Sequence, residues 1–171
     1  MRTIETVLYK FDELSESAQE RAIESLYDIN VSHDWWGLTY DDAARVGLKI
    51  YGFGLDRDRH ATGDFTLSAV EVAANILKEH GENCDTYNTA QTFLDEYNPI
   101  FSDYMNEDSE NYESGDLENE MQDIEADFLK SILEDYSIIL QGESEYLVSE
   151  EVIKECIHAN DYEFTEDGVL A

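Results

Sequence analysis

The sequence predicts an α+β fold: a mostly helical single domain with a small antiparallel sheet and one long amphipathic acidic helix. Three observations predict it. Apolar residues recur every three or four positions through most of the chain, which is the period of an amphipathic helix. Short segments of β-branched or aromatic residues, two of them joined by a polar turn, indicate a small number of β-strands. The 171 residues, 42% of them hydrophobic, suffice for one domain with a core.

The N-terminal segment is predicted to form one strand and two helices. Residues 4–11 alternate moderately and include β-branched side chains, which indicates a strand. A helix follows, with Ser15 or Ser17 as its N-cap. A second helix is expected to begin at Asp34, as its cap, and to end at Gly47, because glycine readily adopts the left-handed conformation that terminates helices.

A β-hairpin is predicted next, followed by a well-marked helix start. The strands cover residues 48–55 and 64–67, and the polar residues 56–63 form the turn between them. Ser68 and Glu71 have the spacing of a capping box, in which each side chain satisfies a free backbone amide at the helix start.

The second half of the chain is predicted to be almost entirely helical. One helix starts at Thr86 or Thr89 and stops before Pro99, the only proline, because proline lacks the amide hydrogen that a helix interior needs. A short strand is expected at residues 146–148, and Ser149 caps the helix after it.

The segment 107–127 is acidic throughout and contains no lysine or arginine. From Asp116 onward the helical period predicts a long helix over residues 116–141, with an acidic row expected on the face opposite its apolar stripe. The apolar stripe consists of Leu117, Met121, Ile124, Phe128, Ile132 and Tyr136, and the acidic row of Asp116, Glu120, Asp123 and Asp127. Like charges at these spacings cost roughly 0.2–0.5 kcal/mol per pair. A self-repelling helix face suggests that the negative charge has a use.

The candidate partner-binding residues are therefore the carboxylates of this segment and two tyrosines near it. Aromatic side chains concentrate at the energetic centres of protein interfaces, which is why the tyrosines are included. The alternative interpretation is a solvated face without a partner. The candidates are Glu107, Asp108, Glu110, Glu113, Asp116, Glu118, Glu120, Asp123, Glu125, Asp127, Tyr104 and Tyr112.

The net charge of −31 restricts the possible partners. Residues 1–78 carry a net charge of −6 and residues 79–171 a net charge of −25, so the domain divides into a near-neutral half, 1–81, and a strongly acidic half, 82–171. Such a field repels phosphate backbones and anionic membranes, which argues against direct nucleic-acid or membrane binding. The partners it favours are strongly basic proteins or cations.

Metal and catalytic sites are weaker alternatives. Residues 56–64 carry alternating oxygen ligands, but they lack the glycine and the distal glutamate of a calcium loop. His80 with Cys84, and Cys156 with His158, are possible zinc ligands without the usual close cysteine pair. No phosphate-binding loop or nucleophile motif is present, so we expect no cofactor, no bound metal and no enzymatic activity.

Several segments resemble a group of uncharacterised acidic proteins encoded by bacteriophages and prophages. The segments are VLYKFDELSESAQERAIE, DINVSHDWWGLTYDDAARVGLKI, ILKEHGENCDTYNTAQTFL and EYLVSEEVIKECIHANDYEFTEDGVLA, which together cover most of the chain. The resemblance implies a phage origin but no chemistry, because the group has no known activity. In charge alone, the chain is also similar to the acidic DNA mimics that phages use against restriction and CRISPR systems.

These observations predict a phage-encoded DNA mimic that blocks the nucleic-acid-binding groove of a host defence protein of the CRISPR or restriction type. The alternative is an acidic adaptor or regulator that binds a basic protein without competing with nucleic acid. Two cysteines and the lack of a signal-peptide pattern predict the host cytoplasm. The sequence leaves open whether two copies pair into a homodimer.

Overall fold

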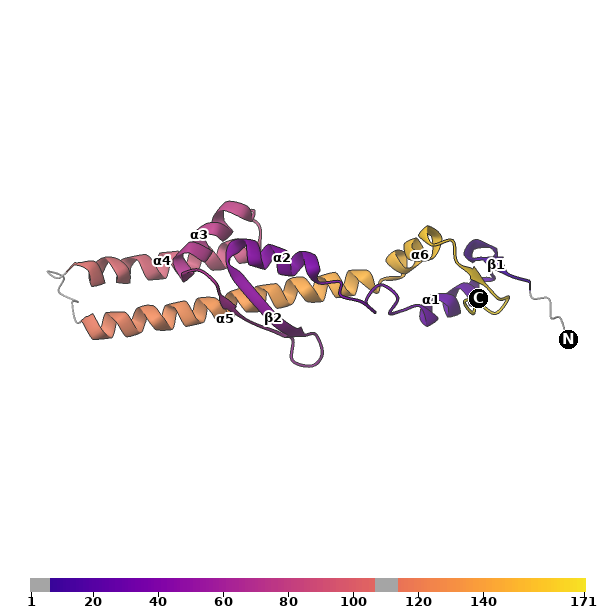
Figure 1. Cartoon of the computed structure of the whole chain (residues 1–171), viewed down its shortest axis with the longest axis horizontal. Helices are drawn as coiled ribbons and strands as arrows, with labels where there is room; N and C mark the ends of the chain where they lie inside the picture. The colour runs from indigo at the N-terminus through magenta and orange to yellow at the C-terminus, as the bar shows by residue number, and fades with distance from the viewer. Residues whose placement is uncertain (1–6, 107–113) are drawn as a thin grey trace. The chain divides into compact units, whose positions relative to one another are not determined.

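The computed structural model describes residues 7–106 and 114–171, and its elements confirm the mostly helical α+β fold (Figure 1). This described part contains six α-helices, one 3-10 helix (η1) and four strands. In chain order the elements are β1 (Tyr9–Lys10), η1 (Phe11–Glu13), α1 (Glu16–Ser25), α2 (Gly37–Val46), β2 (Leu48–Gly54), β3 (His60–Phe65), α3 (Ala69–Glu79), α4 (Asp85–Met105), α5 (Ser114–Leu147), α6 (Glu150–Ala159) and β4 (Glu163–Phe164).

Backbone contacts divide the chain into two compact units. The terminal unit combines residues from 1–35 and 142–171, and the central unit spans 36–141. Their sequences carry net charges of −13 and −18. The predicted charge boundary between residues 81 and 82 therefore does not coincide with the division of the structure.

The terminal unit joins the two ends of the chain through a small antiparallel sheet. Tyr9 of β1 pairs with Phe164 of β4, and helices α1 and α6 pack beside them. Phe164 is fully buried in a core that includes Phe11. Gly168, near the C-terminus, packs closely against the backbone of α1. Gly168 has a φ of +83°, and a Cβ there would lie 2.1 Å from the carbonyl oxygen of Ala18, so only glycine fits.

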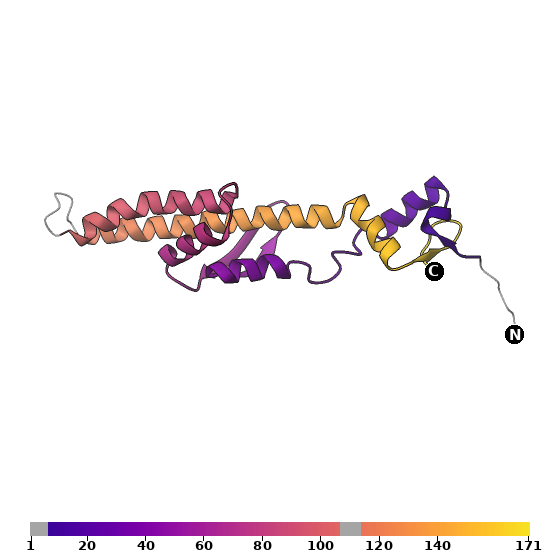
Figure 2. The same cartoon turned by 90° about the horizontal axis from the view of Figure 1, so that it is seen from above.

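The central unit contains the predicted hairpin and the two longest helices. β2 pairs with β3 in antiparallel register, Leu48 opposite Phe65, with an irregularity between Ile50 and Gly52. Helices α4 and α5 run antiparallel and side by side in both views (Figures 1 and 2). Tyr136 of α5 is the largest fully buried side chain of this core.

Four of the predicted helix ends are confirmed, and all four rest on local chemistry. Ser149 caps α6 as predicted. Ser68 accepts a hydrogen bond from the Glu71 amide, and the Glu71 carboxylate accepts one from the Ser68 amide, as a capping box requires. Gly47 follows α2 with a φ of +98°. Ser15, not Ser17, caps α1 by accepting from the Ala18 amide.

Three other predicted boundaries are wrong. Asp34 does not cap α2, because Trp36 occupies the cap position. Pro99 lies inside α4, and α5 continues through residues 146–147, where we expected a strand. Pro99 removes one backbone hydrogen bond, but the aromatic side chains on both sides of it, Tyr97 and Phe101, still stack along the helix.

Candidate protein-binding surface

The apolar stripe of α5 is buried as predicted. Helix α5 begins two residues earlier and ends six residues later than the predicted range 116–141. Of the six predicted stripe residues, Ile124 is half-buried and the other five are buried. The five buried residues are Leu117, Met121, Phe128, Ile132 and Tyr136.

An aromatic ladder joins α5 to its neighbours and fixes its orientation. The Phe128 ring stacks on Phe93 of α4 at a centroid distance of 4.3 Å and lies 5.3 Å from Phe65 of β3. Along α4 the ladder continues from Phe93 to Tyr97 at 5.2 Å and from Tyr97 to Phe101 at 6.0 Å. Stacked and tilted aromatic pairs of this kind stabilise packing beyond the burial of their area. The side of α5 that carries Phe128 therefore faces α4.

The predicted acidic row of α5 is exposed, but its direction differs from the prediction. With 3.6 residues per turn, Asp116, Glu120, Asp123 and Asp127 fall within a strip about 60° wide. The strip lies between the α4 side of the buried stripe and the direction opposite the stripe. The positions that point most directly away from the stripe are Asn119 and Lys130, followed by Asp123 of the row and Ala126.

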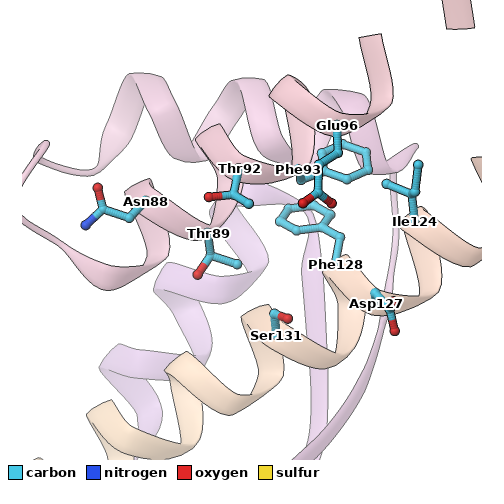
Figure 3. Close-up of a pocket in the computed structure, with 9 residues that line it drawn as sticks. All are labelled: Asn88, Thr89, Thr92, Phe93, Glu96, Ile124, Asp127, Phe128 and Ser131. Carbon is cyan, nitrogen blue, oxygen red and sulfur yellow. The ribbon is translucent and has the colours of Figure 1, made fainter. Parts of the chain in front are cut away.

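A pocket between α4 and α5 shows how the acidic row meets the neighbouring helix (Figure 3). Glu96 of α4 and Asp127 of α5 line the same cavity of about 320 Å³. Phe93, Ile124 and Phe128 form its apolar part, and hydroxyl and amide groups complete its lining: Thr89, Thr92, Ser131 and Asn88. Two consecutive helices thus bring to one place carboxylates that are 31 positions apart in the sequence.

The antiparallel register places a second α4 carboxylate beside the row. Because Glu96 lies near Asp127 and both helices rise ~1.5 Å per residue, Asp103 is level with Glu120. Glu96 and Asp103 are seven residues apart, which is about two helical turns, so they share one side of α4. We define the acidic face as these carboxylates of the two helices: Asp116, Glu120, Asp123 and Asp127 of α5 with Glu96 and Asp103 of α4.

The remaining candidate residues lie elsewhere. Glu118 and Glu125 are on the other edge of the buried stripe, about half a turn from the acidic row. Glu118 is exposed, whereas Glu125 is half-buried and hydrogen-bonded to Tyr97. Burial, the charge of Glu125 and that hydrogen bond raise the pKa of Tyr97. Tyr104 is half-buried in the last turn of α4. Glu107, Asp108, Glu110, Tyr112 and Glu113 lie outside the described residues.

Several residues of the alternative calcium and zinc sites make structural contacts in the described part of the chain. Arg59, inside the predicted cation loop, forms an ion pair with Glu134 and donates a hydrogen bond to Gln141 Oε1 at 2.8 Å, both on α5. Cys156 is half-buried, and the His158 ring packs against Phe11 at a centroid distance of 5.7 Å. Within residues 7–106 and 114–171, no group of three or more histidine, cysteine or acidic side chains is placed to hold a metal ion.

Comparison with known proteins adds no relative. No protein-family model matches the chain, and no curated protein or solved structure is significantly similar to it. Because no relative is found, the function is inferred from the charge and geometry of this chain alone.

None of the helices in the described residues has the length and apolarity needed to span a membrane.

Proposed function

We propose that the chain is a phage-encoded, non-enzymatic inhibitor that binds a basic nucleic-acid-binding protein of host defence, of the CRISPR or restriction type, and blocks its nucleic-acid groove. The acidic face would occupy the positions of phosphates. The observation that carries the proposal is that α4 and α5 present their carboxylates side by side. Residues 79–141 contain one lysine, Lys130, and no arginine, so few cationic side chains of this segment are available to neutralise them.

The spacing of the charges is compatible with a groove that binds phosphates. Carboxylates one turn apart are separated by ~5.4 Å along the helix, compared with ~3.4 Å of rise per phosphate in one strand of duplex DNA. A single row is therefore sparser than one DNA strand. The second row, from α4, raises the charge density, and long lysine and arginine side chains can adjust to the remaining difference.

A competition experiment tests the proposal. Purified defence effectors would be mixed with a labelled duplex or guide-bound target and increasing amounts of the protein, and the bound fraction followed by gel shift. We expect the protein to displace the nucleic acid from at least one effector class, with an apparent affinity that falls steeply as salt is raised. Binding that leaves the nucleic acid in place would contradict the proposal.

That second result would support the alternative function, an acidic adaptor or regulator. One observation favours it: Ile138 and Ile139 are large apolar side chains exposed on α5. Protein interfaces combine apolar centres with polar rims, whereas a phosphate-binding groove has little use for isoleucine. An adaptor would use these side chains together with nearby carboxylates and would leave nucleic-acid binding unchanged.

A further inference from the structure

A second acidic pocket lies in the central unit, separate from the acidic face. It has a volume of about 470 Å³, and four elements or the turns beside them contribute to it. Its carboxylates are Asp42 of α2, Glu79 of α3, Asp85 of α4 and Asp135 of α5, and no lysine or arginine lines it. Sequence reasoning missed it because these four residues are spread over more than ninety positions.

Two of the carboxylates are held in place by hydrogen bonds. The buried Tyr136 hydroxyl donates to Asp42 Oδ2 at 2.9 Å, and the Thr89 hydroxyl donates to Asp135 Oδ2 at 2.6 Å. Burial is the main reason that the pKa of Asp135 is raised. Arg45 Nη1 lies 3.9 Å from Asp42 Oδ1, and Lys78 Nζ lies 3.3 Å from Glu79 Oε1, so two of the four carboxylates have counter-charges just outside the lining. Asp85 and Asp135 form no ion pair among the described residues, and they leave the pocket with negative charge that its own lining does not balance.

His80 gives an independent indication that the pocket takes a ligand. Its side chain is nine-tenths buried and lines the pocket, and its Nδ1 lies 2.7 Å from Thr86 Oγ1. Nε2 is buried and 3.3 Å from Asp42 Oδ2, a distance that permits an ion pair, yet it has no hydrogen-bond partner among the described residues. Buried nitrogens of native proteins are normally hydrogen-bonded, so His80 Nε2 is an atom that a ligand entering the pocket would satisfy.

Catalysis is a poorer explanation of the same groups. Thr86, His80 and Asp42 have the order of a hydroxyl–imidazole–carboxylate triad. However, Thr86 is only 2% exposed, so its hydroxyl is not accessible to the carbonyl carbon of a substrate. The open part of the pocket is bordered by carboxylates instead.

The arrangement selects among cations. A metal ion needs several ligands that converge on one point, and within the described residues no such group exists here. A guanidinium is planar and carries five N–H donors, so it can reach carboxylates that are too far apart to share a point charge. Ile138 and Ile139 also line the pocket and supply an apolar surface for the methylene groups that carry a guanidinium.

We propose that this pocket binds the guanidinium group of an arginine side chain, with Asp42 and Asp135 as its principal acceptors and His80 beside Asp42. Binding of a small guanidinium compound requires only the pocket. Insertion of an arginine from a basic partner rests, in addition, on the proposed function.

The experiment is an NMR titration of the whole protein with N-acetyl-L-arginine methylamide. We expect saturable shifts of the His80 ring and of the backbone amides near Asp135. The citrulline analogue, which has nearly the same shape without charge, should bind at least about tenfold more weakly, the loss expected for one or two charge-assisted hydrogen bonds. The lysine analogue should also bind more weakly, because a point charge cannot span the acceptors.

Matched variants locate the site. Asp135→Asn keeps an oxygen that can accept from Thr89, and we expect it to weaken arginine binding about tenfold. Asp85→Asn, at an exposed rim position, should weaken binding as well and covers the case in which the first variant fails to fold. Glu20→Gln makes the same charge change at an exposed position of α1, outside the pocket and the acidic face, and should leave binding unchanged. Shifts that do not saturate, equal binding of citrulline, or equal effects of Asp135→Asn and Glu20→Gln would overturn the proposal.

The two proposals fail separately. Saturable arginine binding together with no displacement of nucleic acid from any effector would retain the pocket and reject the inhibitor function. Displacement of nucleic acid by a protein whose pocket does not bind the arginine compound would do the reverse.

Discussion

At the scale of single residues, the central unit depends on a few buried polar contacts. Tyr136 is fully buried, and its hydroxyl reaches the side chain of Asp42 from another helix. Burial, together with the nearby charge of Asp42, raises the pKa of Tyr136, so the phenol stays protonated and remains a donor. The contact ties α5 to α2 at the edge of the guanidinium pocket.

Removing that hydroxyl should destabilise the protein without creating a large cavity. We expect Tyr136→Phe to lower the free energy of unfolding by about 1–2 kcal/mol, because the carboxylate of Asp42 loses a donor but remains partly accessible to water. Urea denaturation near pH 7 would measure it. Tyr27→Phe, at an exposed position, is the control and should change little. Equal stability of the two variants would show that the hydroxyl contributes nothing.

Asp135 should make the folded protein more stable as pH falls, whereas most carboxyl groups of folded proteins make it less stable. Its pKa is raised in the folded protein, first by burial and then by the charges of Asp85 and Glu134, although the Thr89 hydrogen bond opposes this. The folded state therefore binds this proton more tightly than the unfolded state, whose aspartate titrates near 3.9. Stability from this group rises as pH falls through the folded pKa and is lost again as pH increases.

The test compares wild type with Asp135→Asn, which does not titrate at this position. Free energies of unfolding would be measured at neutral pH and at about pH 4, near the unfolded aspartate value. The difference should shift in favour of wild type at the lower pH. A difference that is the same at both values would mean that burial does not perturb this carboxyl group.

At the scale of the helices and strands, the aromatic ladder decides how α4 and α5 pack. Phe128 is in contact with rings from both α4 and β3, so it links all three elements. The ladder also explains why α4 continues past Pro99. A proline inside a helix costs about 3 kcal/mol, and the ring contacts of Tyr97 with Phe93 and with Phe101 offset part of that cost by holding both sides of Pro99 in one helix.

Truncating the central ring should be costly. We expect Phe128→Ala to lower the free energy of unfolding by about 3–5 kcal/mol, the usual range for removing a buried aromatic side chain. Phe101→Ala, at the exposed end of the ladder, should cost much less. Chemical denaturation of both variants provides the comparison, and similar losses would show that the ladder is not organised around Phe128.

Charge reversal tests whether the acidic face, rather than charge in general, binds the partner. We expect the triple variant Glu120→Lys, Asp123→Lys, Asp127→Lys to fold and to lose displacement of nucleic acid. The control is Glu16→Lys, Glu20→Lys, Glu24→Lys on α1, where three exposed acids receive the same change in net charge. Circular dichroism checks the fold and gel shift the activity. Equal activity of the two variants would place the binding surface elsewhere.

At the scale of the whole molecule, net charge and fold oppose each other. A net charge of −31 on 171 residues repels itself, and the repulsion is greatest in the compact state. The Debye length falls from roughly 30 Å at 0.01 M salt to about 8 Å at 0.15 M, so added salt should relieve much of the repulsion.

The melting temperature should therefore rise between these two sodium chloride concentrations, as measured by differential scanning calorimetry. Magnesium chloride at matched ionic strength is the control. If screening alone is responsible, it should produce a similar rise. A much larger effect of magnesium would indicate cation binding at particular carboxylates, and no effect of either salt would mean that self-repulsion is a minor part of the stability.

Local chemistry made several features predictable from sequence. The Ser68–Glu71 capping box, the left-handed Gly47 and the apolar period of α5 each involve residues within one or two turns of each other. Such interactions are set by neighbours along the chain, so the sequence states them directly. The acidic charge of the second half is likewise a property of composition.

Tertiary structure decided the features that depend on residues far apart in sequence. The packing of Phe93 on Phe128 sets which edge of α5 borders α4. The position of Glu96 and Asp127 in one pocket follows from that packing. The same holds for the four carboxylates around His80, which no spacing along the chain relates. Periodicity specifies that a helix has a buried face. Which neighbouring element borders each of its other faces is decided only by the side chains that pack against the buried face.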